Sequence, residues 1–78
     1  MRYYLNKLDR GMKKELEGKL TYLDKVIMKR CEDGADILSI LSYCKPYVGE
    51  HGTREFATTG EVTKSVGKLV QLKVLRKQ

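Results

Sequence analysis

The feature that most constrains the fold of this chain is an apolar stripe between Tyr4 and Arg30. Seven apolar residues recur there at spacings of three and four: Leu5, Leu8, Met12, Leu16, Leu20, Leu23 and Ile27. On a helix these side chains fall within a stripe about 120° wide. The pattern predicts one amphipathic helix over residues 4–30, about 39 Å long if it is unbroken.

Two glycines lie within this segment. Gly11 and Gly18 each weaken a helix by about 1 kcal/mol relative to alanine. They mark a close approach of another backbone, a tolerated defect, or a break near Gly11 that divides the segment into two helices. A domain of this length has a radius of gyration of about 11–12 Å, so an unbroken helix would project beyond it. Either the helix kinks at a glycine, or a second copy covers part of the stripe. We therefore expect a homodimer through the seven apolar residues.

The totals place the chain among small folded proteins. Its 78 residues make one domain, residues 1–78, and the 41% apolar and 33% charged residues argue against wholesale disorder. The formal charge of +6 favours nucleic acid or another anionic partner. No run of eighteen apolar residues predicts a membrane span, and the N-terminus has no apolar signal core, so a cytoplasmic location is expected.

Few residues of the chain are candidates for metal binding, disulfide formation or catalysis. Cys31, Cys44 and His51 do not follow a recognised metal-binding spacing, and two cysteines do not make a disulfide framework. We expect both thiols to be free and at least half-buried. No glycine-rich phosphate loop and no nucleophile beside a base is apparent. The sequence therefore predicts no enzymatic activity, no metal and no cofactor.

A short second helix is predicted over residues 36–44. Gly34 is suited to end the preceding segment, and Asp33 or Asp36 can cap the next one. The helix is apolar nearly all round, so we expect it at the centre of the domain, and it should end near Lys45 because Pro46 follows. Residues 47–58 are predicted to form a loop, with Phe56 and Ala57 buried.

The C-terminal stretch predicts a third helix, from Thr59 to Leu72. Thr59 is its expected cap, and an apolar segment follows it. One face of this helix is apolar: Val62, Val66, Leu69 and Val70. The opposite face is small or polar: Thr63, Lys64, Gly67, Lys68 and Gln71. A face of this kind can lie in the major groove of DNA, where slim polar side chains reach base edges and lysines reach phosphates.

The pattern T-x-x-V-x-x-x-V-x-x-L-V-x-L-x-V-L-R over residues 59–76 resembles the recognition helix and exit of winged-helix proteins of the helix-turn-helix class. Lys73 stands where those families usually place glycine. The resemblance covers the last quarter of the chain, and an ordinary amphipathic helix that leads into a strand would share the spacings. It implies a mainly α fold with a helix-turn-helix-like core over 36–75. A full wing needs a second strand, and only Arg76, Lys77 and Gln78 follow Leu75, so we expect the wing to be absent or minimal. Thr53–Ala57 departs from the family pattern, because a typical second helix is longer.

The resemblance implies a DNA-binding protein, a regulator of transcription or replication that acts as a homodimer on double-stranded DNA. The expected DNA-contacting residues are Arg54, Thr59, Thr63, Lys64, Lys68, Gln71, Lys73 and Arg76, with Lys77 as a further phosphate contact. The alternative is a protein-interaction module, an adaptor or inhibitor whose N-terminal helix docks on a partner protein. RNA binding is a third option, for which the sequence shows no interleaved aromatics on a strand. Basic residues gathered on one exposed face would favour DNA, and scattered ones would favour the interaction module.

Overall fold

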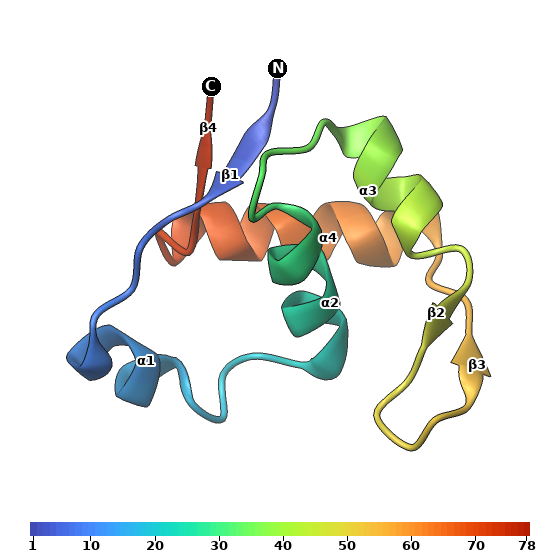
Figure 1. Ribbon diagram of the computed structural model, residues 1–78, viewed down its shortest axis with the longest axis horizontal. Coiled ribbons are helices and arrows are strands. Elements are labelled where there is room, and N and C mark those ends of the chain that lie inside the picture. The colour runs from blue at the N-terminus through green and yellow to red at the C-terminus, as the bar shows by residue number, and fades with distance from the viewer.

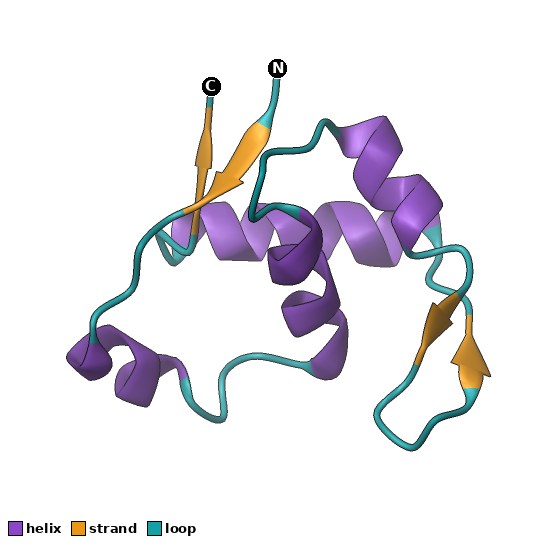
Figure 2. Cartoon of the chain, in the orientation of Figure 1, coloured by secondary structure: helices purple, strands orange, loops and turns teal.

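The computed structural model describes all 78 residues and combines four helices with two small antiparallel sheets (Figures 1 and 2). In chain order the elements are β1 (Tyr3–Leu5), α1 (Arg10–Leu16), α2 (Tyr22–Arg30), α3 (Ile37–Tyr43), β2 (Tyr47–Val48), β3 (Arg54–Glu55), α4 (Thr59–Gln71) and β4 (Leu75–Lys77). The expectation of a mainly α fold is corrected to a mixed α/β fold, because strands join the two ends of the chain and separate α3 from α4. No helix is long and apolar enough to span a membrane.

The prediction of one continuous helix over residues 4–30 is wrong. That segment divides into β1, α1 and α2, and the turn between the helices contains Gly18 at φ +86°. The side chains at both helix starts explain the division. Asp9 accepts a hydrogen bond from the backbone N–H of Met12 at 2.8 Å, and Thr21 accepts one from the N–H of Asp24 at 3.2 Å. These caps begin two separate helices, so the break lies at Gly18, while Gly11 lies inside α1.

The apolar stripe nevertheless packs into this molecule. Leu16 and Ile27 are buried, Leu5, Leu8, Leu20 and Leu23 are partly buried against the core, and Met12 is half-exposed. An unbroken exposed helix was the reason to expect a second copy, and that helix does not exist. Dimerisation stays a prediction for which the fold supplies no new support. The radius of gyration, 11.9 Å, agrees with the compact size expected from the length.

The core lies where α2 and α3 pack against α4 (Figure 1). Its fully buried large side chains include Ile27, Ile40 and Leu69, with Cys31 and Cys44 beside them. Both cysteines are free and buried, which confirms that prediction. Burial raises the pKa of the Cys31 thiol to about 11, with a further contribution from Cys44 and an opposing one from Arg30.

The two ends of the chain form one antiparallel ribbon. Tyr3 pairs with Lys77, Tyr4 with Arg76 and Leu5 with Leu75. The predicted apolar exit from the third helix into a strand is confirmed, with Val74 and Leu75 buried. Because its partner is the N-terminal strand, β4 closes the domain and does not begin a wing (Figure 2).

The second predicted helix is confirmed as α3, but its burial differs from the expectation. Asp36 caps it by accepting a hydrogen bond from the N–H of Ser39 at 2.8 Å, and Cys44 ends it. Ile40 is fully buried, whereas Leu38 is 71% exposed, because α3 packs on α2 and α4 with one face only.

A hairpin replaces part of the loop predicted over residues 47–58. Tyr47 pairs with Glu55 and Val48 with Arg54, and Gly52 occupies the turn at φ +78°. Ala57 is buried as predicted, but Phe56 is 69% exposed, so its predicted burial is wrong. Of the two residues that follow β3, only Ala57 reaches the core, and Tyr47 of β2 packs against it.

Candidate nucleic-acid interface

Helix α4 is a surface helix with one apolar and one polar face, as the sequence predicts. Val62, Val66 and Leu69 are buried and Val70 is partly buried. The outward residues are Gly60, Thr63, Lys64, Gly67 and Gln71, all of them exposed. At 100° per residue these five lie within about 100° of one another around the helix axis, so they form one narrow face. We call this set the α4 outer face.

The N-terminus of α4 is capped by Thr58, one residue before the predicted cap, Thr59. Thr58 keeps an extended backbone, with φ −75° and ψ 159°, and its Oγ1 accepts the N–H of Glu61 at 3.1 Å. The same hydroxyl donates to Oε1 of Glu61 at 3.0 Å. Thr59 is the first helical residue, and its hydroxyl accepts a hydrogen bond from Nζ of Lys45 at 3.1 Å.

The α4 outer face presents little side-chain bulk and no carboxylate. A Cβ placed on Gly60 or Gly67 would meet no other atom within 4 Å, so open space lies over both. Thr63 donates its hydroxyl to the carbonyl of Thr59 at 2.8 Å, which holds its methyl group and oxygen close to the helix. The amine of Lys64 has no ion pair and no hydrogen bond within the protein. This face therefore offers one free cation on a low surface that another backbone can approach closely.

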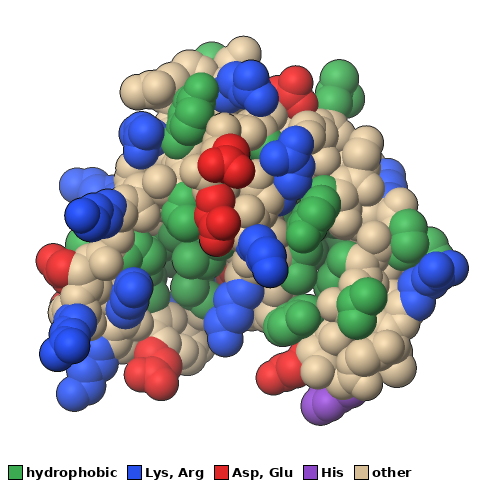
Figure 3. Space-filling view, viewed as in Figure 1, with side chains coloured by type: hydrophobic (Ala, Val, Ile, Leu, Met, Phe, Trp, Pro, Cys, Tyr) green, Lys and Arg blue, Asp and Glu red, His purple; other side chains and the backbone are tan.

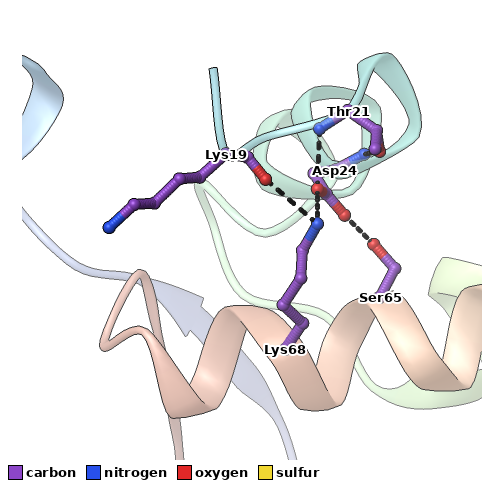
Figure 4. Close-up of polar contacts among 5 residues, drawn as sticks. All are labelled: Lys19, Thr21, Asp24, Ser65 and Lys68. Atoms are coloured by element: carbon purple, nitrogen blue, oxygen red, sulfur yellow. Dashed lines mark hydrogen bonds and ion pairs between the residues drawn. The ribbon is translucent and has the colours of Figure 1, made fainter. Parts of the chain in front are cut away.

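Lys68 has a partner inside the protein. Its Nζ forms an ion pair with Asp24 and donates a hydrogen bond to the carbonyl of Lys19 at 3.3 Å (Figure 4). The Asp24 carboxylate is almost fully buried, and it also accepts the hydroxyl of Ser65 and, at 2.8 Å, the N–H of Thr21. Lys68 was predicted to contact DNA. In the structure it instead neutralises a buried acid and joins α4 to the start of α2.

The contacts around Asp24 also set its protonation. Burial alone would raise the pKa of this carboxyl, but hydrogen bonds from Lys68, Ser65 and the Thr21 N–H, together with the charge of Lys68, outweigh it. The net pKa lies below the ordinary value of 3.8, so Asp24 is charged at neutral pH. Asp24 is therefore a charged link between two helices, buried and fully hydrogen-bonded.

The C-terminal part of the chain, which includes most of α4 and the strand that follows it, is basic. Residues 62–78 contain five lysines or arginines and no acidic residue. Lys73 and Lys77 are exposed, while Arg76 lies over the Tyr4 ring at 5.1 Å and donates to Oδ1 of Asn6 at 3.1 Å. Lys73 has φ +63°, a left-handed conformation. Glycine is the residue that this conformation favours, because a side chain is strained there.

The predicted DNA-contacting residues do not form one patch. Thr63, Lys64 and Gln71 share the α4 outer face, and Thr59 lies at its start. Lys73 and Arg76 follow the other end of the helix, Lys68 turns toward α2, and Arg54 is on the hairpin. Basic side chains also gather around α1, where Arg10, Lys13 and Lys14 are exposed (Figure 3).

Sequence reasoning missed the buried pair of Asp24 and Ser65, although a signal was present. Thr21 and Asp24 have the spacing of a capping box, and Gly18 precedes them in the chain. That combination indicates the start of a new helix. Ser65 gave no such signal, because a serine on a helix is usually exposed.

Comparisons with known proteins give no match, whether with protein-family models, curated protein sequences or solved structures.

Proposed function

We propose that this protein binds double-stranded DNA through the α4 outer face. The observation that carries the proposal is a thirteen-residue surface helix whose outward side combines two glycines, a threonine, a glutamine and an unpaired lysine, without a carboxylate. An α-helix fits the major groove, and glycines at the contact let its axis come close to the bases. The net charge of +6 adds attraction to phosphate.

Each outward side chain has a role in this proposal. Gln71 can bond an adenine edge with both its oxygen and its nitrogen, and Thr63 can bond a base or contact a thymine methyl group. Lys64 reaches a phosphate, and the exposed Lys73 and Lys77 contact the backbone beyond the helix. Lys68 and Asp24 act indirectly, because they hold α4 against α2.

The connection before α4 sets this arrangement apart from a standard helix-turn-helix. A helix-turn-helix joins its helices through a turn of about three or four residues. Here a hairpin stands between α3 and α4. We propose a variant in which α2 and α3 support the reading helix from behind, and in which the protein regulates transcription or replication.

The test is fluorescence anisotropy with a labelled random-sequence duplex over a series of salt concentrations. We expect micromolar binding that weakens linearly in a plot of log affinity against log salt. Lys64→Glu should weaken binding to all sequences and lower the salt slope by about 1. Lys64 has no partner in the fold, so its replacement should leave stability unchanged.

Lys14→Glu is the matched control, since it makes the same charge change on α1. An equal effect of both variants would show that only net charge matters, and the assignment to α4 would be abandoned. Absence of duplex binding at low salt would remove the DNA proposal altogether.

The alternative function is a protein-interaction module. The spread of Lys64, Lys68, Lys73 and Arg76 over different surfaces favours it, as does the hairpin that stands in place of a second helix before α4. It also depended on a free N-terminal stripe, and the fold does not leave that stripe free. Six of its seven residues pack against or within the core of this molecule. The large apolar side chains that are exposed lie mainly on α3 and the hairpin and at the start of α2.

A further inference from the structure

An open groove separates α2 and α3 from the hairpin. Its volume is about 670 Å³, within the usual range for ligand sites. Figure 3 shows hydrophobic side chains gathered over this part of the surface. Tyr22 and Val26 line one side, Tyr43 a second, and Tyr47 and Val48 the hairpin side.

Both aromatic rings and cations line this groove. Three of the five tyrosines of the chain line it, and Tyr22 and Tyr43 are 38% and 42% exposed. The charged residues of the lining are Lys29 and Arg54, both exposed, and no carboxylate lines it. Rings that stack bases beside cations that bind phosphate are the features of sites for single-stranded nucleic acid.

The groove continues toward α4. A second hollow of about 470 Å³ shares Tyr22 and Tyr47 with it and is also lined by Lys64 and Lys68. In this hollow Asp24 is paired with Lys68, and Glu61 is bonded to Thr58. Lys64 therefore remains the free charge on the far side of the two shared tyrosines, and the cations Lys29 and Arg54 lie on the near side.

We propose that this tyrosine groove binds single-stranded nucleic acid, with bases stacked on Tyr22 and Tyr43 and phosphates held by Lys29 and Arg54. These four residues lie outside the α4 outer face, and Lys64 alone borders both surfaces, so the site does not depend on duplex binding there. A duplex keeps the faces of its bases stacked inside the helix, so rings in a recess cannot reach them. A single strand can turn its bases outward onto the rings. An acidic peptide without aromatic residues would match the charges of the groove but would leave the tyrosine rings without flat partners.

The test measures anisotropy of a fluorescein-labelled twelve-nucleotide thymidine strand with the whole protein. We expect Tyr22→Ala and Tyr43→Ala each to weaken binding by at least about fivefold, which corresponds to loss of one stacked base. Phe56→Ala is the matched control, because Phe56 is an aromatic residue with 69% exposure that lines no groove. It should change the affinity less than twofold.

Two further probes separate stacking from charge. An abasic strand with the same number of phosphates should bind at least about tenfold more weakly than the thymidine strand. Arg54→Glu should weaken both strands, whereas the tyrosine variants should weaken only the strand that carries bases. Circular dichroism of every variant checks that the fold is retained.

Several results would overturn the proposal. Equal binding of the abasic strand would show a purely electrostatic surface. Stronger binding of a Glu- and Phe-containing peptide of equal charge would assign the groove to a protein partner. Tyrosine variants that weaken duplex and single strand equally would make the groove part of the duplex interface. Loss of duplex binding in Lys64→Glu with intact single-strand binding would instead support the groove as a site of its own, because its proposed contacts do not include Lys64. The two proposals therefore fail separately.

Discussion

Lys73 adopts the left-handed conformation that ends α4. The N–H of Val74 donates to the carbonyl of Leu69 at 2.9 Å, and the N–H of Lys73 donates to that of Val70 at 3.0 Å. This pair of bonds is the Schellman motif, in which glycine is the favoured residue at the left-handed position. Val74 and Leu69 are both buried, so the motif also turns the chain back into the core.

Lys73→Gly should stabilise the fold by about 1 kcal/mol, because a Cβ in the left-handed region is strained. The shift in the urea midpoint of unfolding measures it. Lys73→Ala removes the same charge but keeps the Cβ, so it should give no gain. Equal stabilisation by both variants would show that charge, and not backbone strain, is relieved.

The buried carboxylate of Asp24 makes Lys68 a structural residue. Lys68→Met should destabilise the protein by about 2–3 kcal/mol, less than for a fully buried pair because Lys68 is partly exposed. Lys64→Met, on the same helix and without a partner, should change the free energy of unfolding by less than about 0.5 kcal/mol.

The lowered pKa of Asp24 also predicts how the free energy of unfolding depends on pH. Its pKa is lower in the folded state than the ordinary 3.8, so its contribution is fully present above that value and is lost as the pH falls through the folded pKa. Thermal unfolding between pH 5 and about pH 2 should therefore show a loss of stability in the wild type that is smaller in Asp24→Asn. Parallel curves for the two proteins would contradict this role.

At the scale of elements, caps and turns decide where helices begin and end. The N-terminal stripe has the correct period for one helix, yet Asp9 and Thr21 each start a new one, and Gly18 allows the turn between them. Periodicity reports which residues face the core, and it does so even across a break. It does not report whether the residues between two apolar positions are helical.

Two glycines on open surface provide a direct test of whether turns, and not apolar spacing, decide where a helix ends. A Cβ on Gly18 or on Gly67 would meet nothing within 4 Å, but Gly18 has φ +86° and Gly67 lies inside α4. Gly67→Ala should stabilise the protein by about 0.5–1 kcal/mol, because alanine favours the helix. Gly18→Ala should destabilise it by about 1 kcal/mol.

Chemical denaturation of the two variants measures both effects. Stabilisation by Gly18→Ala would indicate that the segment prefers the continuous helix. If Gly67→Ala raises stability and weakens duplex binding, the low surface of α4 serves DNA contact and not folding.

At the scale of the whole molecule, pairing between the two ends holds the domain closed. The N–H of Arg2 donates to the carbonyl of Gln78 at 2.6 Å, and the N–H of Gln78 donates to that of Arg2 at 2.8 Å. β1 lies beside Ala35 as well as β4, and Gly34 lets the Tyr4 ring pack on its backbone. A chain of this size buries only a small core, and the ribbon adds backbone hydrogen bonds between the two ends of the chain.

The sequence by itself determined the local features of this protein. The position of α3, a helix cap at Asp33 or Asp36, the apolar face of α4, the free thiols and the apolar exit strand follow from residue type and spacing, and neighbours in the chain suffice to predict them. The one-sided burial of α3 does not follow from them. Only the tertiary structure decided which residues distant in the chain meet. The pairing of Asp24 with Lys68, the ribbon of the two ends and the tyrosine groove each join segments that no local pattern relates. Asp24 meets Lys68 because burial of the shared core brings α2 against α4, and the ribbon and the groove depend in the same way on contacts between other elements that are distant in the chain.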